Sequence, residues 1–418
     1  RPADITSPLR IKGVVYNEMK GVYSDLDGLI GRRITAALFP DNAYGRDYGG
    51  DPEAIPRLTY DRFRRFHRDR YHPSNALIFT YGNIPLRRYL EYLDAAYLSD
   101  FREKELDISI KPPGRFRAPR AERFHYPIGS AENAEKKTAV VAAWRTGKNL
   151  DPVETLAGHV LSYYLLANAA SPLRRALIDS RLGEELTESG YFSHQRDTYF
   201  TVGCKGCART ASEKVHDLLA ETFRRIAGDG VEEKKMEAAF HHLELSAREV
   251  KSLYPLRLMD RTFESWASGG EPELWLNLNR HIRALRRRWE GEAGYFERMI
   301  ESLFLNNPAR VLLTFLPSPD YAARKEKRER TRLKKRKAEM DENELRQTAA
   351  RARKLRQSQL QPNSPRELAT LPRLSRDDVP RLPVPLKTVR EETASGNRFL
   401  KKDMFSNGLS YLDLAYIP

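Results

Sequence analysis

The segment GVVYNEMKG, residues 13–21, places a carboxylate beside an apolar helical stripe. Val15, Met19 and Val22 are spaced i, i+4 and i+7, the pattern of a buried helix face. Glu18 lies at the edge of that face, one turn from an apolar residue on either side. A carboxylate in such a place needs an ion pair or a metal to offset its desolvation, so we predict that Glu18 is a metal ligand. An ordinary solvated glutamate is the alternative.

Three blocks of sequence, in order along the chain, resemble one family of peptidases. They are GVVYNEMKGVYS at 13–24, ALFPDNAYGRDYGGDPEAIPRLT at 37–59 and FHRDRYHPSNALIFTYGN at 66–83. These blocks closely resemble the presequence protease branch of the pitrilysin/insulysin metallopeptidases. The segment SPLRRALIDSRLGEEL at 171–186 resembles the second domain of that family.

The resemblance implies a zinc site to which Glu18 contributes. In this family an inverted motif, H-x-x-E-H, supplies two histidine ligands and a general-base glutamate, and a glutamate on a later helix supplies the third ligand. Glu18 occupies that later position. A catalytic zinc with three protein ligands keeps one position for water and lowers the pKa of that water to about 7. The implied reaction is therefore attack of zinc-bound water on a peptide carbonyl.

The motif itself is missing, because neither H-x-x-E-H nor H-E-x-x-H occurs in the 418 residues. The nearest string, HHLEL at 241–245, has a leucine in place of the second histidine, and we interpret it as an ordinary helix face. We therefore expect no catalytic residue within this chain and a general-base glutamate upstream of Arg1. The alternative is a non-catalytic relative, such as the structural homologues in respiratory complexes, although these tend to lose the glutamate too.

Composition favours a large protein with conventional cores. Hydrophobic residues make up 40% of the chain and charged residues 31%, which suffices for two domains. The chain has no apolar run long enough to cross a bilayer, so no membrane contact is expected. Only two cysteines, Cys204 and Cys207, are present, which favours a reducing compartment. The matrix of mitochondria or plastids, or a bacterial cytoplasm, fits this expectation.

The net charge of +15 is concentrated in one segment. Residues 321–360 hold 15 Lys and Arg against 6 Asp and Glu, a net +9, with neither proline nor glycine. This pattern predicts an exposed helical arm. The arm has no aromatic residue after Tyr321 on which a base could stack, so no nucleic-acid partner is expected. Contact with an acidic substrate or partner is the functional alternative to a solvated arm.

Periodicity predicts alternating strands and helices. In the first part, Thr59 caps a helix that ends before Pro73, Ala76–Tyr81 forms a buried strand, and Pro85 begins another helix. The remaining predicted strands are Val140–Trp144, Tyr199–Gly203 and Val311–Leu316. The remaining predicted helices begin near Pro152 and at Pro172, or carry the stripes Val215–Ile226, Met236–Val250 and Leu278–Trp289.

The expected fold class is α+β, with two tandem homologous pitrilysin-type α/β domains followed by a helical hairpin arm. We expect the first domain to be truncated at its N-terminus. The predicted parts are the C-terminal part of a zinc-binding peptidase domain at 1–110, a linker at 111–123, a second pitrilysin-like domain at 124–318, a basic helical hairpin at 319–361, and an extended connector with the start of a second half at 362–418.

Several short motifs have simpler interpretations than function. Cys204-x-x-Cys207 has redox or zinc-knuckle spacing, but no second cysteine pair is present and the motif ends a strand. His72 fits a polar turn residue satisfied by local hydrogen bonds. Glycines 49–50 fit a sharp turn, because the lysine of a phosphate loop is absent. Gly21 weakens a helix relative to alanine, so we expect close packing around it.

The function implied by the resemblance is part of a zinc-dependent endopeptidase, a hydrolase that degrades short unstructured peptides, such as cleaved targeting presequences, in a closed chamber. Zn²⁺ is the expected cofactor and Glu18 its ligand. Peptides are the expected partners of a monomer that closes as an intramolecular clamshell, and this chain alone is expected to be inactive. The alternatives are a non-catalytic scaffold or assembly subunit with the same fold and, third, a basic RNA-associated factor.

Overall fold

A computed structural model describes residues 4–380, 382, 390–394 and 397–415. The chain forms two units: Ile11–Arg324, and a second unit that joins Arg1–Arg10 to Lys325–Pro418. Within the described part of the chain, none of the helices is long and apolar enough to cross a membrane.

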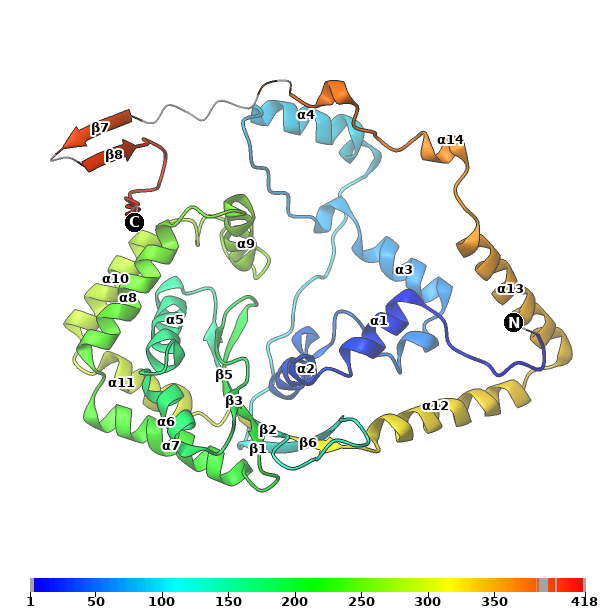
Figure 1. The fold of residues 1–418 in the computed structure, drawn as a ribbon, viewed down its shortest axis with the longest axis horizontal. Helices are drawn as coiled ribbons and strands as arrows, with labels where there is room; N and C mark the ends of the chain where they lie inside the picture. The colour runs from blue at the N-terminus through cyan, green and yellow to red at the C-terminus, as the bar shows by residue number, and fades with distance from the viewer. Residues whose placement is uncertain (1–3, 381, 383–389, 395–396, 416–418) are drawn as a thin grey trace. The chain divides into compact units, whose positions relative to one another are not determined.

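A six-stranded mixed sheet organises the first unit (Figure 1). The strand order is β1-β6-β2-β5-β3, and β4 also pairs with β5. Only β1 and β6 are parallel; the other pairs are antiparallel. The strands are β1 (Arg120–Pro127), β2 (Thr138–Lys148), β3 (Glu185–Leu186), β4 (Gly190–Phe192), β5 (Asp197–Cys207) and β6 (Arg310–Ser318). The predicted strands at Val140–Trp144, Tyr199–Gly203 and Val311–Leu316 are confirmed as β2, β5 and β6.

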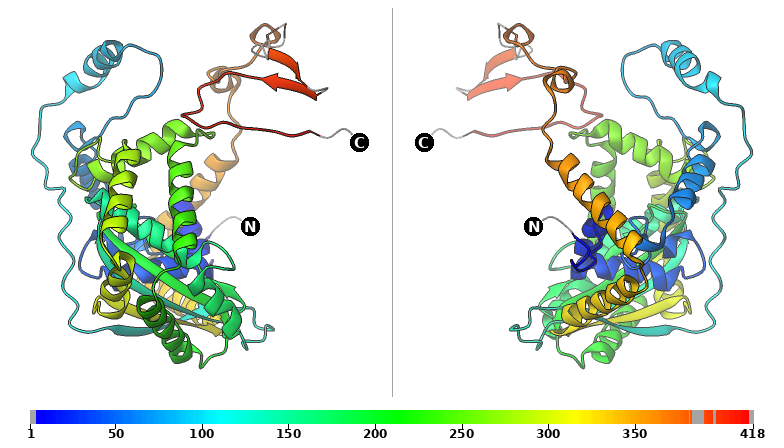
Figure 2. Two further views of the ribbon diagram at one scale, coloured as in Figure 1. Left: turned by 90° about the vertical axis from the view of Figure 1, so that its left-hand side faces the viewer. Right: turned by 90° about the vertical axis from the view of Figure 1, so that its right-hand side faces the viewer.

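Helices lie against one face of this sheet (Figure 2), and their apolar side chains form the larger hydrophobic core with it. An aromatic group lies at its centre, where the Trp144 ring packs edge-on against Phe223 and Phe304 at centroid distances of 5.8 and 5.4 Å. The indole Nε1 of Trp144 donates to the Phe304 carbonyl at 3.1 Å, so this buried polar group is satisfied. The helices that contribute to this core are α5 (Pro152–Leu166), α6 (Pro172–Ser180), α7 (Ser212–Asp229), α8 (Glu233–Arg248), α10 (Leu278–Gly291) and α11 (Tyr295–Ile300).

Local signals in the sequence explain where these helices begin. The Asp151 side chain accepts hydrogen bonds from the backbone of Val153 and Glu154 at 3.0 and 3.1 Å, and Pro152 occupies the first position of α5. The predicted helices near Pro152, at Pro172 and along the three apolar stripes are confirmed as α5, α6, α7, α8 and α10.

The second face of the sheet is covered by α2 (Leu26–Leu38). Apolar residues of α2, among them Ile34 and Leu38, form one buried cluster with Val141 of β2 and with Leu313 and Phe315 of β6. Because both faces of β2 and β6 are covered, these strands are nearly continuous apolar runs instead of alternating ones.

Residues 60–96 form two further helices whose side chains are largely exposed. These are α3 (Tyr60–Arg70) and α4 (Leu86–Ala96), as predicted, and the Thr59 side chain caps α3 by accepting from the Arg62 backbone at 3.3 Å. The strand predicted at Ala76–Tyr81 is wrong: these residues pair with no other strand of the described chain. A strand requires a neighbour for its backbone hydrogen bonds, and Tyr81 is 57% exposed.

The second unit contains the basic arm from Lys325 onward. The predicted helical arm is present as two helices, α12 (Tyr321–Ala338) and α13 (Glu342–Leu360), and the Asp341 side chain caps the second by accepting from the Glu344 backbone at 2.7 Å. Lys337 Nζ donates to the carbonyls of Thr6 and Ser7 at 3.0 and 2.8 Å. The remaining elements are α14 (Pro365–Leu368) and the hairpin of β7 (Arg390–Ala394) and β8 (Asn397–Lys401).

The α+β fold class is confirmed, whereas the tandem repeat of homologous domains and the boundaries given above stay predictions. Part of the predicted connector at 362–418 lies outside the described residues. The helix between α8 and α10 is α9 (Tyr254–Trp266), which no apolar stripe had indicated.

Candidate functional site

The predicted ligand, Glu18, lies on α1 (Val14–Val22). The residues that α1 buries are Tyr16 and Met19, whereas Val15 is 55% exposed. The predicted stripe is therefore correct at Met19 and wrong at Val15. Neighbouring residues cover α1 on the side of Tyr16 and Met19. The buried face is therefore rotated away from the predicted face that included Val15.

A loop between α2 and α3 holds Met19 in place. A side chain at Gly49 would place its first carbon 2.5 Å from the Met19 sulfur, so glycine lets the loop lie directly against this side chain. The loop is itself fixed by an ion pair, in which Arg32 Nε lies 2.5 Å from Asp47 Oδ2. Burial, followed by hydrogen bonding to Asp47, raises the pKa of the neighbouring Tyr23. The helix that carries Glu18 thus has a firm support.

Glu18 projects from the exposed side of α1, so the expectation that burial desolvates its carboxylate is wrong. Within the described part of the chain its carboxylate makes no hydrogen bond or ion pair, and no group of three His, Cys, Asp or Glu side chains is arranged to hold a metal ion. Because a catalytic zinc requires three protein ligands, these residues do not make a complete zinc site. Glu18 alone offers one free carboxylate on a fixed helix.

Gly21, in the same helix, does not show the predicted close packing. A side-chain carbon built at this position would meet nothing within 4 Å, so the prediction is wrong. The helix approaches its neighbours through Tyr16 and Met19, and the side of α1 that carries Gly21 is open.

The simpler interpretations of two other motifs are confirmed. His72 accepts a hydrogen bond at Nδ1 from the Ser74 backbone at 3.1 Å and so caps a short turn. His241 and Glu244 lie on the surface of α8, where Glu244 pairs with Arg286 at 3.4 Å. Neither motif takes part in a cluster of metal-ligating residues within the described chain.

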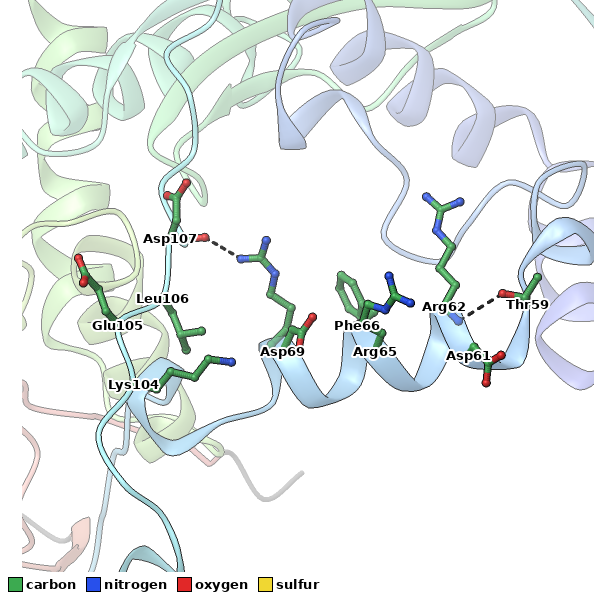
Figure 3. Close-up of a pocket in the computed structure, with 11 residues that line it drawn as sticks. Thr59, Asp61, Arg62, Arg65, Phe66, Asp69, Lys104, Glu105, Leu106 and Asp107 are labelled. Atoms are coloured by element: carbon green, nitrogen blue, oxygen red, sulfur yellow. Dashed lines mark hydrogen bonds between the residues drawn. The ribbon is translucent and has the colours of Figure 1, made fainter.

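An open groove of about 610 Å³ runs along α3 (Figure 3). The segment 104–107 forms its other wall, and Arg70 Nη1 donates across the groove to the Asp107 carbonyl at 2.7 Å. Four basic and four acidic side chains line the groove, so its charge is balanced, and the residues that line it include no histidine or cysteine. The groove therefore lacks the pairing of a nucleophile with a histidine base that covalent catalysis commonly uses.

The structure also assembles a buried polar chain that sequence patterns had not indicated. His159 Nε2 lies 3.0 Å from Ser193 Oγ, and this hydroxyl donates to Glu264 Oε1 at 2.8 Å. Burial lowers the pKa of His159 to about 4 and raises the pKa of Glu264. Asn149 supports the chain by donating to the carbonyls of Ser193 and Glu264 at 3.1 and 2.9 Å. No local motif connects these residues, which come from distant parts of the sequence.

Two family models match the chain. Residues 57–243 match the model described as the peptidase M16 inactive domain. Residues 315–417 match the model for the region associated with peptidases of M16 subfamily C. Together these ranges include the sheet strands β1 to β5 and the basic arm.

Curated relatives match nearly the whole chain. Presequence protease 1, chloroplastic/mitochondrial, of Arabidopsis thaliana is 35% identical over 99% of this chain and 39% of its own length. Protein HypA of Clostridium perfringens is 31% identical over 98% of this chain and 42% of its own length. The chain thus spans about two fifths of the length of these relatives.

Solved structures share the fold. The crystal structure of a protease from Helicobacter pylori covers 74% of this chain, and this chain covers 73% of it, at a TM-score of 0.59 and 14% identity. This similarity concerns the fold alone. The two family models and the presequence protease relatives show that the chain belongs to the M16 peptidase family, in its presequence protease branch.

Proposed function

We propose that this chain forms part of a zinc-dependent endopeptidase that degrades short unstructured peptides, and that Glu18 is one of the zinc ligands. The relatives named presequence proteases support the peptidase class. The assignment of Glu18 is carried by its place in GVVYNEMKGVYS, residues 13–24, which resembles the segment that supplies the third zinc ligand in this family, and the structure adds that its unpaired carboxylate lies on a helix anchored by Tyr16 and Met19.

A firm support matters for a ligand of this kind. A free carboxylate on a flexible segment would lose side-chain and backbone entropy when it binds a metal, whereas α1 is already fixed by the contact of Met19 with Gly49. Because the described residues offer no second and third ligand, we propose that those ligands come from residues outside this sequence. Mitochondria or plastids are the proposed compartments, as in the names of the relatives.

Zinc content and peptide cleavage, measured on the complete protein that carries this sequence, test the proposal. The variant Glu18→Gln keeps the shape of the side chain and removes its charge. Peptide cleavage should fall at least about tenfold and zinc content should fall with it, because losing even an outer-shell partner of a metal usually costs about tenfold in affinity or activity. Glu91→Gln, which removes an exposed carboxylate from α4, is the matched control and should change neither quantity.

A second candidate, a non-catalytic scaffold, is favoured by the match of residues 57–243 to the inactive domain of the family. The same experiment separates the two functions. A zinc-free and inactive complete protein would support the scaffold and refute the peptidase. Zinc binding and cleavage that survive in Glu18→Gln would instead leave the peptidase in place and refute the role of Glu18.

A further inference from the structure

The two cysteines of the chain lie in contact inside the larger core. Cys204 and Cys207 are 3% and 0% exposed, and their sulfur atoms are 3.3 Å apart. The Cys207 thiol also donates to the Cys204 carbonyl at 3.4 Å. Both side chains belong to the same buried cluster, so they point to the same face of the sheet.

A bulge in β5 brings these thiols together. In a regular strand, residues three apart point to opposite faces. Here Cys204 pairs with Val140 and Cys207 with Thr138, so three steps along β5 correspond to two along β2. Gly206 absorbs the extra residue with a φ of 78°, a conformation that favours glycine. The bulge thus places both thiols on the same face of the sheet, whereas a regular strand would place them on opposite faces.

The backbone separation at the bulge is compatible with a disulfide. Two residues of β2 span roughly 6.6 Å along the strand, and the paired positions on β5 are separated by a similar distance. Disulfides connect Cα atoms that lie about 4.4 to 6.8 Å apart. Closing the bond requires the two sulfur atoms to approach from 3.3 Å to about 2.05 Å, which needs only a small side-chain movement.

The two thiols are not equivalent. Hydrogen bonding from Cys207 lowers the pKa of the Cys204 thiol, and the same interaction, with burial, raises the pKa of Cys207. Cys204 lies beside the short edge strand β3, where Leu186 is its partner. The lowered pKa makes Cys204 the better nucleophile towards the oxidant, and Cys207, in contact with it, is the thiol placed to attack the oxidised Cys204.

We propose that Cys204 and Cys207 form a reversible dithiol–disulfide site that hydrogen peroxide oxidises. The Cys204 thiolate attacks one peroxide oxygen and breaks the O–O bond, which gives a sulfenic acid at Cys204 and hydroxide, and the hydroxide takes up a proton to become water. The Cys207 sulfur then attacks the Cys204 sulfur, forms the S–S bond and releases the sulfenic oxygen as a second water. Two thiols are oxidised and one peroxide is reduced to two waters.

The small size of the oxidant fits the burial of the site. Gly183 packs so closely on Cys204 that a side-chain carbon at this glycine would lie 2.8 Å from the Cys204 Cβ. A bulky disulfide such as oxidised glutathione cannot enter while β3 is in place. Hydrogen peroxide is only slightly larger than a water molecule and requires only brief opening of the two-residue edge strand.

Mass spectrometry of the folded 418-residue chain tests the proposal. After exposure to peroxide, the protein is denatured in the presence of an alkylating reagent. The expected product has lost two hydrogens in mass and has no alkylated cysteine, and dithiothreitol restores both thiols. Cys204→Ala and Cys207→Ala are the controls, each checked for folding by its melting temperature, and neither should lose two hydrogens.

Trapping with dimedone identifies the nucleophile. Cys207→Ser, whose hydroxyl can still donate to the Cys204 sulfur, should form the dimedone adduct of a sulfenic acid, whereas Cys204→Ser should form much less of it. The proposal is overturned if the folded wild-type chain still has two alkylatable thiols after exposure to peroxide. It is also overturned if peroxide oxidises the thiols only when the chain is unfolded in urea. Equal adduct formation in the two variants would overturn the assignment of Cys204 as the attacking thiol.

Discussion

Acidification should destabilise the first unit through His159, which lies in the buried chain with Ser193 and Glu264. Its pKa falls from 6.5 in a solvated reference to about 4 in the folded protein, because burial disfavours the charged ring. Between these values the unfolded chain binds the proton and the folded chain does not. The stabilising effect is therefore complete above about pH 6.5 and is lost as the pH falls towards 4.

The magnitude follows from the difference between the two pKa values. A difference from 6.5 to about 4 corresponds to about 3 kcal/mol of unfolding free energy, as an upper limit. Glu264 acts in the opposite direction, because its raised pKa stabilises the folded protein at low pH and this effect is lost as the pH rises through its folded pKa. The net acid loss should therefore lie below the limit set by His159 alone.

Urea unfolding, followed by tryptophan fluorescence between about pH 7.5 and 4.5, measures this effect. In His159→Gln the amide can still donate to Ser193 but cannot take up a proton, so its unfolding free energy should depend less on pH than that of the wild type. His241→Gln, which replaces a histidine whose side chain is 71% exposed, is the control for the same substitution at the surface. Parallel pH profiles for the wild type and His159→Gln would refute the reasoning.

Three substitutions test the packing described above, each by urea unfolding. Gly21→Ala should stabilise the protein by up to about 1 kcal/mol, because its new methyl meets nothing in an open helix; destabilisation would contradict the position of α1. Gly203→Ala should cost about 1 to 3 kcal/mol or more, since its methyl would collide with the Val140 carbonyl. Phe304→Ala should cost about 3 to 5 kcal/mol through loss of its stacking on Phe223, and a cost below about 1 kcal/mol would disprove its place in the core.

The elements that could be predicted from the sequence carry their signal locally. An aspartate cap followed by proline indicates the start of α5, and continuous apolar runs indicate β2 and β6. Ala76–Tyr81 has the same kind of run as Val311–Leu316, yet only the latter forms a strand. The difference is non-local, because β6 lies between β1 and β2, whereas the described chain provides no neighbour for residues 76–81.

The candidate sites also depend on non-local contacts that the sequence pattern does not reveal. Glu18 could be singled out from its motif, but the face that α1 buries depends on the approach of Gly49, which helical periodicity does not contain. The spacing of Cys204 and Cys207 was visible, whereas their contact depends on a bulge set by pairing with β2. The chain of His159, Ser193 and Glu264 could not be predicted at all, since it is made by tertiary packing alone.

The position of α2 has a consequence for how the chain can be cut. Its residues 26–38 precede the sheet in the sequence by a long stretch, and residues 101–113 between them are extended and mostly exposed. The side chains Leu29, Ile30, Ile34 and Leu38 are buried in the cluster with the sheet, which corresponds to on the order of 10 kcal/mol of hydrophobic stabilisation. A protease that cleaves within 101–113 should therefore produce a nicked protein whose two pieces co-purify until denaturant separates them.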